Sequence, residues 1–187
     1  FKLKVGGDEA ADLDRLTRIA SVLDQIKEPY HATLDGNEQY PDADSIAAFY
    51  RKLSDVPALS RLVSSILFVE QPVNRNAALA QPVDKLAALV PVIIDESDGA
   101  VSSFPEARAL GYSGVSSKAC KGIYKSIINH ARCRIWNGQN DSRFFMSAED
   151  LTCEPGIAIQ QDLALVNLLG LTHVERNTHH FIDGFGD

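Results

Sequence analysis

Five charged residues in the first two thirds of the chain each follow a short apolar run: Lys4, Asp35, Glu70, Asp95 and Lys118. Three carboxylates that converge can bind one divalent cation, and ligation by oxygen alone suits magnesium, with manganese as the alternative. No histidine or cysteine accompanies the acids at a spacing typical of zinc sites. The five could instead be solvated turn residues, but five in succession in the order Lys, acid, acid, acid, Lys favour a functional site.

The lysines suit proton transfer. Lys2 lies two residues before Lys4, so both side chains are expected on the same face of a strand. Two lysines near each other and near a divalent cation lose a proton more readily than a free lysine. A lysine of this kind can act as a general base near neutral pH.

The apolar runs predict strands that alternate with helices along the chain. The predicted strands are 1–5, 31–34, 65–69, 91–94, 114–117, 143–146 and 171–175; the predicted helices are 8–23, 44–62, a weaker and partly broken 76–89 that contains Pro82, 103–110, 123–136 and 156–169. Such alternation predicts βαβ units and a parallel sheet. In α/β sheets and barrels of this kind the active site lies at the carboxyl ends of the strands.

The spacing of the charged residues predicts the type of sheet. Successive members of the set lie 23 to 35 residues apart, and a (β/α)8 barrel of about 250 residues averages roughly 31 per unit. We therefore predict an α/β protein with a (β/α)8-type TIM barrel that is incomplete, because about seven units are present. If the missing strand is the first, Lys4 ends strand 2 and Lys118 ends strand 6. These strands are opposed in an eight-stranded barrel, so the two ammonium groups would face each other across the pocket.

Composition excludes several classes of partner. The net charge of −7 argues against nucleic acid and anionic membranes, and no apolar run approaches the ~20 residues of a membrane helix. Three cysteines at unrelated spacings indicate a reducing compartment, so a cytoplasmic protein is expected. The chain begins at Phe1 without a methionine, which suggests a fragment of a longer protein.

The ordered motifs Lys-x-Lys, Asp-x-Asn, Glu-Gln-Pro, Asp-Glu-Ser and Ser-Lys resemble the barrel domain of the enolase superfamily, in particular its muconate lactonizing enzyme branch. The resemblance extends from Phe1 to about Lys121 and more loosely through Glu154-Pro155-Gly156-Ile157. It implies that residues 1–187 form one enolase-like C-terminal barrel domain with strands 2 to 8. Strand 1 and the N-terminal capping domain would be absent.

The resemblance also implies a mechanism. Asp35, Glu70 and Asp95 would be magnesium ligands, and Lys4 and Lys118 would be the acid/base pair. Lys2 would hold a carboxylate or enolate oxygen, and Asn37, Glu96 and Glu154 would be supporting residues. Such enzymes remove a proton α to a carboxylate, and magnesium stabilises the enediolate intermediate. The expected activity is that of a racemase, epimerase or cycloisomerase acting on a small carboxylic acid.

Departures from the family limit the branch and the substrate. No histidine lies between Arg132 and Leu171, which excludes the histidine base of the mandelate racemase branch. The Asp-x-Asp that dipeptide epimerases share near strand 8 is replaced there by Thr172-His173-Val174-Glu175-Arg176-Asn177, which argues against a dipeptide substrate. Glu149 and Glu154 compete for the position after strand 7. The alternatives are a syn-dehydratase of the same family or a catalytically incomplete metal-binding barrel fragment. A barrel that lacks a strand has open edges, so a homo-oligomer is expected.

Overall fold

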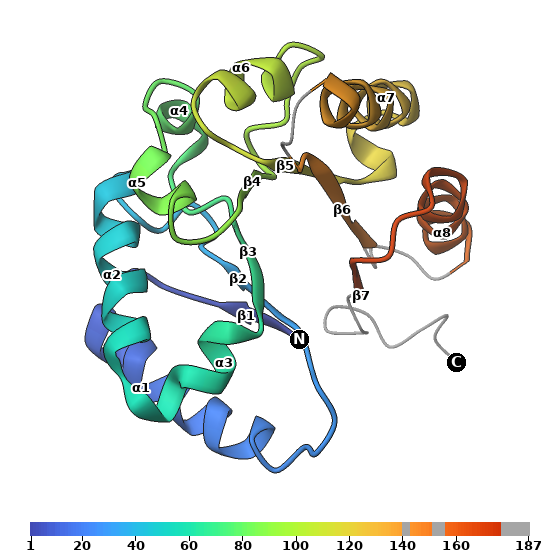
Figure 1. Cartoon of the computed structure of the whole chain (residues 1–187). Helices are drawn as coiled ribbons and strands as arrows, with labels where there is room; N and C mark the ends of the chain where they lie inside the picture. Colours follow the sequence, from blue (N-terminus) through green and yellow to red (C-terminus); the bar gives the residue numbers. More distant parts are fainter. Residues whose placement is uncertain (140–142, 151–155, 177–187) are drawn as a thin grey trace, which may run out of the picture. The chain divides into compact units, whose positions relative to one another are not determined.

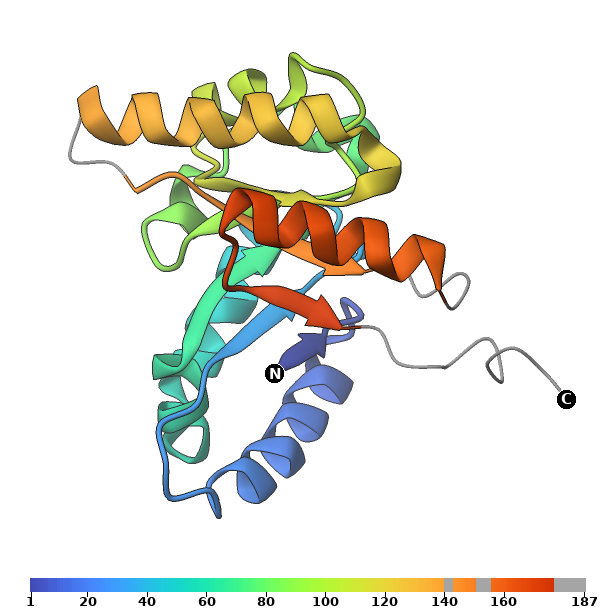
Figure 2. The ribbon, with the colours of Figure 1, turned by 90° about the vertical axis from the view of Figure 1, so that its right-hand side faces the viewer.

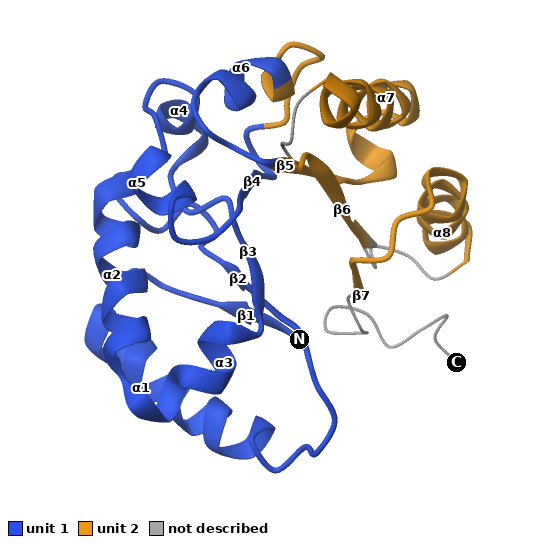
Figure 3. Cartoon of the chain, in the orientation of Figure 1, with its two compact units in different colours: residues 1–97, 105–113 blue, residues 98–104, 114–187 orange. Residues whose placement is uncertain are grey.

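The structure is a computed structural model that describes residues 1–139, 143–150 and 156–176. The chain divides into two compact units, coloured separately in Figure 3. The first comprises residues 1–97 and 105–113, and the second comprises residues 98–104 and those from 114 onward. Each unit is described by itself.

Four parallel strands form the sheet of the first unit: β1 (Lys2–Lys4), β2 (Ala32–Asp35), β3 (Ile66–Glu70) and β4 (Val92–Ile94). The strands follow one another in chain order (Figure 1). The β4 side chains are all buried, as expected for a parallel strand covered on both faces. Lys4 lies opposite Asp35, and Asp35 lies opposite Glu70. The register therefore brings the charged strand ends to one edge of the sheet.

Helices connect these strands and cover the outer face of the sheet (Figure 1). They are α1 (Glu9–Leu23), α2 (Ala43–Asp55), η1 (Pro57–Leu59), α3 (Ser60–Ser64), α4 (Arg75–Ala78), α5 (Asp84–Ala87) and α6 (Ser103–Ala109), which spans the unit boundary. The two long helices begin at aspartate caps. Asp8 accepts hydrogen bonds from two backbone N–H groups of α1, and Asp42 accepts one from Ser45. Both caps satisfy amide groups that a helix start leaves unpaired.

Two helix predictions differ from the structure at prolines. The predicted helix 44–62 is wrong in its length, because α2 ends at Asp55. Val56 before Pro57 is extended, with φ −91° and ψ 112°, as sterics before proline require. The weaker helix 76–89 is two short helices, α4 and α5, with Pro82 between them.

The second unit contains three parallel strands in chain order: β5 (Gly114–Ser117), β6 (Phe145–Asp150) and β7 (Val174–Arg176). Between them lie η2 (Ala119–Lys121), α7 (Ile123–Gln139) and α8 (Ile157–Leu169). Both long helices pack on β6 and contact each other (Figure 2). The predicted strand 143–146 is displaced, because β6 continues to Asp150 and therefore includes Glu149.

Alternating parallel strands and helices in both units confirm the predicted α/β class. In the part of the chain that the structure describes, no helix combines the length and the apolar character needed to cross a membrane.

Candidate metal and proton-transfer site

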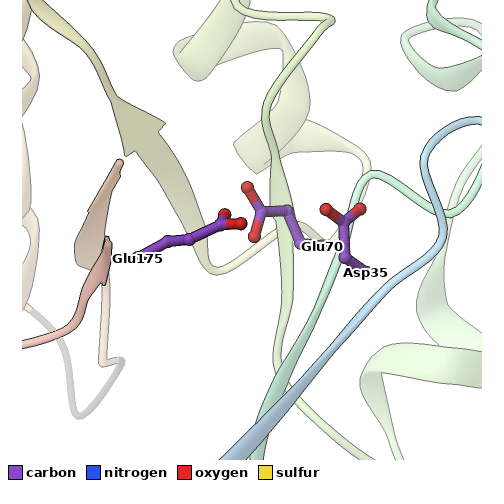
Figure 4. Close-up of side chains that lie close together, drawn as sticks. All are labelled: Asp35, Glu70 and Glu175. Atoms are coloured by element: carbon purple, nitrogen blue, oxygen red, sulfur yellow. The ribbon is translucent and has the colours of Figure 1, made fainter. Parts of the chain in front are cut away.

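Two lysines of β1 meet the two acids that end β2 and β3. Lys2 Nζ lies 2.9 Å from Asp35 Oδ2 and 3.0 Å from Glu70 Oε2. Lys4 Nζ lies 2.6 Å from the same Asp35 Oδ2. Figure 4 shows the Asp35 and Glu70 carboxylates at the ends of neighbouring strands. The shared partner confirms that Lys2 and Lys4 project from the same face of β1.

Asp95 extends this cluster from the residue that follows β4. The exposed fractions of Asp35, Glu70 and Asp95 are 1%, 2% and 3%, so all three acids are buried. One carboxylate oxygen of Glu70 lies within 4.8 Å of one from Asp35, and one lies within 4.8 Å of an oxygen from Asp95. Glu70 therefore lies close to each of the other two predicted ligands of the first unit.

The electrostatics of Glu70 show that this cluster suits a cation. The pKa of Glu70 is raised to about 7, chiefly by burial; the Lys2 ammonium group opposes the rise, and the negative charges of Asp35 and Asp95 add to it. Glu70 Oε1 is buried and has no hydrogen-bond partner among the residues that the structure describes. Buried carboxylates are costly unless cations or hydrogen bonds compensate them. Three buried acids with oxygen ligands and an unpartnered oxygen fit a hard cation such as magnesium, which Asp35, Glu70 and Asp95 would hold.

The predicted supporting residues connect the loops behind these acids. The Asn37 backbone N–H donates to Asp35 Oδ1 at 2.9 Å, and Asn37 Nδ2 donates to Glu96 Oε1 at 3.3 Å. Asn37 adopts a left-handed φ of 39°, a conformation that asparagine tolerates better than most residues. Burial, followed by the negative charge of Asp95, raises the pKa of Glu96.

The structure adds two residues of the first unit that the sequence interpretation missed. Gln71 is completely buried and hydrogen-bonds to the turn after β4. Arg75 clamps Glu38, with Nε 2.9 Å from Oε1 and Nη2 2.7 Å from Oε2, and lowers the pKa of Glu38. The Glu-Gln-Pro motif could have drawn attention to Gln71. The ion pair between Arg75 and Glu38 joins residues 37 positions apart, so no local sequence pattern predicts it.

Lys118 directly follows β5 in the second unit and forms an ion pair there. Lys118 Nζ lies 2.6 Å from Glu149 Oε2, and each side chain is 12% exposed. Glu154, the other candidate for this position, lies outside the described residues. Glu149 is therefore the candidate acid that the structure places beside Lys118.

Two further acids of the second unit were not predicted as site residues. Asp162 of α8 is buried, and its Oδ1 accepts the Ala119 backbone N–H at 2.9 Å. This contact fixes the backbone directly after Lys118. Glu175 of β7 lies opposite Glu149 in the strand register. A buried acid within the apolar sequence of α8 is a signal that could have identified Asp162.

No protein-family profile matches the chain, and a search of curated proteins finds no match. Solved structures do match. A mandelate racemase/muconate lactonizing protein from Herpetosiphon aurantiacus aligns with a TM-score of 0.69 at 21% identity, covering 93% of this chain and 46% of that one. The dipeptide epimerase from Enterococcus faecalis V583 gives 0.70 at 19% identity, with coverages of 93% and 46%. The muconate lactonizing enzyme from Klebsiella pneumoniae gives 0.68 at 20% identity, with coverages of 94% and 46%.

These similarities establish the fold. The chain spans about half the length of the structures that it matches, since 46% of each is covered. The incomplete TIM barrel expected from the sequence is confirmed: the chain has the (β/α)8-type barrel fold of mandelate racemase/muconate lactonizing proteins, with seven strands among its described residues.

Proposed function

We propose that this protein is a magnesium-dependent enzyme that moves a proton α to the carboxylate of a small acid. The observation that carries the proposal is the buried cluster of Asp35, Glu70 and Asp95, with Lys2 and Lys4 paired to it. The cluster lies at the carboxyl ends of parallel strands, where barrel enzymes hold their active sites. The fold shared with racemases, epimerases and lactonizing enzymes supports the same reaction class.

The two lysines of β1 differ in a way that suggests different roles. Lys2 is 13% exposed and binds two carboxylates, so its ammonium group is suited to neutralising negative charge. Lys4 is 52% exposed, so its amine can reach a substrate and act as a base once it loses its proton. Magnesium, when bound, would stabilise negative charge on the substrate carboxylate.

Lys118 is proposed as the second acid/base residue, on the resemblance of the ordered motifs. Glu149, 2.6 Å from Lys118 Nζ, would orient this amine and favour its protonated form. With two active lysines, a proton removed by one and returned by the other gives racemisation or epimerisation. With one active lysine, cycloisomerisation or syn elimination follows.

We also propose which metal ion and which class of substrate the protein binds. The metal is magnesium, with manganese as the alternative, and the substrate is a small carboxylic acid. Muconates are the first class to test, because a solved structure of this fold is named as a muconate lactonizing enzyme. Dipeptides come second: another is named as a dipeptide epimerase, but the Asp-x-Asp of those enzymes is missing near strand 8. We further propose a cytoplasmic homo-oligomer that binds neither nucleic acid nor membranes.

Exchange of substrate hydrogen with deuterated solvent tests this function. The protein is incubated with a panel of dipeptides and other α-substituted carboxylic acids, with magnesium or with EDTA, and α-deuteration is followed by NMR. The proposal predicts magnesium-dependent deuteration of at least one acid, lost in Lys4→Ala. Muconates are followed separately by lactone formation. Activity that persists in EDTA, or in Asp35→Asn, would contradict the proposed role of the carboxylate cluster.

A further inference from the structure

The side chain of Gln71 connects the end of β3 with the turn that follows β4. Its exposed fraction is 0%. Gln71 Oε1 accepts the backbone N–H of Asp95 at 2.8 Å and that of Ser97 at 3.1 Å. Gln71 Nε2 donates to Val73 O at 2.8 Å and to Ser97 Oγ at 2.7 Å. All of these residues belong to the first unit.

These four contacts use the whole hydrogen-bonding capacity of the amide. A glutamine amide offers two lone pairs on oxygen and two N–H donors. The backbone N–H groups of Asp95 and Ser97 can only donate, so they fix which end of the amide is the oxygen. Loss of the oxygen would leave two N–H groups of a buried turn without partners, which is costly.

The backbone of Gln71 is held in a conformation that glutamine seldom adopts. Its φ is +32°, in the left-handed region. Its N–H donates to Ile93 O at 2.9 Å, and its C=O accepts from Glu38 N at 2.9 Å. The loops after β2, β3 and β4 are thus joined through one residue, and the surrounding contacts maintain its unfavourable φ.

We propose that Gln71 is a positioning residue: it holds the Asp95–Ser97 turn so that the Asp95 carboxylate stands beside Glu70. A glutamine directly after one acid thereby fixes the backbone of the next acid, 24 residues further along the chain. The expected effect of Gln71 on magnesium affinity rests on the proposed function. The hydrogen bonds by which Gln71 fixes the turn do not depend on that function.

Gln71→Met tests the inference, because methionine keeps much of the shape and volume while it removes the amide. In the metal-free protein we expect hydrogen exchange at the Asp95 and Ser97 amides to quicken at least tenfold, measured by NMR. By isothermal titration calorimetry we expect magnesium to bind at least tenfold more weakly. Gln71→Gly, which relieves the backbone conformation but also lacks the amide, should show the same two changes.

Tyr112→Phe is the matched control. It removes another buried side-chain hydrogen bond of the first unit, the one from Tyr112 Oη to Ala78 O at 3.2 Å, without touching the turn. We expect it to leave the magnesium affinity and the exchange at Asp95 and Ser97 unchanged. If Gln71→Met lowered stability while both site readouts matched those of the control, Gln71 would have only a structural role and the inference would be overturned.

Ser97→Ala provides a milder variant if the methionine variant does not fold. It removes the hydrogen bond to Gln71 Nε2, and faster exchange of the Asp95 amide is expected; unchanged exchange would overturn the inference. If the wild-type protein bound no magnesium, the proposed function would fail, and the exchange at Asp95 and Ser97 would still decide whether Gln71 holds the turn.

Discussion

Lys2 and Lys4 share a strand and a carboxylate partner but differ in accessibility. Lys2 is 13% exposed between two carboxylates, and Lys4 is 52% exposed beside one. At the residue scale, exposure therefore separates a charge-neutralising lysine from a lysine that a substrate can reach.

Replacing either proposed base should remove turnover and spare metal binding. For Lys4→Ala and for Lys118→Ala we expect a loss of kcat of about 10²–10⁴-fold, the usual contribution of a general acid or base. Magnesium binding should not weaken, because neither lysine is a proposed ligand and Lys4→Ala removes a competing positive charge beside Asp35 Oδ2. Initial rates and calorimetric titrations check the two parts. An active Lys118→Ala variant would exclude a mechanism with two bases.

The pKa of Glu70 predicts how the stability of the metal-free protein depends on pH. The pKa is about 7 in the folded protein, against an ordinary value of 4.5. Between these values the unfolded chain releases the Glu70 proton while the folded protein keeps it. The stabilising contribution is thus fully present below pH 4.5 and is lost as the pH rises to about 7.

Glu70→Gln tests this dependence because glutamine does not titrate. The free energy of unfolding, measured by urea denaturation in EDTA, should fall less steeply between pH 4.5 and 7 in the variant than in the wild type. Identical slopes for the two proteins would show that Glu70 does not keep its proton in the folded state.

At the scale of elements, close backbone contacts between strand-end loops hold the acids in place. Gly36, directly after Asp35, packs against the loop after β3. A Cβ atom at Gly36 would lie 2.5 Å from Pro72 Cα, which is backbone and cannot rotate away. The loop after β2 therefore requires glycine for space.

Gly36→Ala should consequently separate the loops after β2 and β3. We expect a loss of about 1–3 kcal/mol of unfolding free energy, as for other overpacked sites, together with weaker magnesium binding. Gly99→Ala is the control, because a Cβ atom there would meet nothing within 4 Å. Denaturant melts of the two variants provide the comparison, and equal stability would contradict the close packing at Gly36.

For the whole molecule, metal binding and folding should be linked. An ion that binds the folded state and not the unfolded chain stabilises the fold by about 2.7 kcal/mol at a hundredfold excess over its Kd. Magnesium should therefore raise the Tm of the wild type and have little effect on the Tm of Asp35→Asn. Differential scanning calorimetry with magnesium or EDTA measures both. An equal shift in the variant would place the ion outside the proposed cluster.

The order of strand-end charges was predictable because each charge follows its own apolar run directly. Lys4, Asp35, Glu70, Asp95 and Lys118 all lie at or directly after the end of a strand. Local sequence determines such positions, and parallel pairing then brings the first three to one edge. The same local signals underlie the predicted α/β class and the fold resemblance.

Contacts between distant residues were not predictable from local patterns. Gln71 follows a strand in the same way as many polar residues, and only the structure shows its hydrogen bonds to Asp95 and Ser97. The ion pair of Glu149 with Lys118 was likewise not predictable, since β6 extends four residues beyond the predicted end at Met146 and so includes Glu149. The predicted end of the helix 44–62 was wrong, because Pro57 ends the regular helix although the apolar pattern continues past it.

The most direct test of the account is an anomalous difference map from crystals grown with manganese, which takes the same oxygen ligands as magnesium. The account predicts a single strong peak between the Asp35, Glu70 and Asp95 carboxylates, with an oxygen of each about 2.1–2.2 Å from the ion. No peak at these acids in crystals that contain the ion, or a peak bound only by other residues, would contradict it.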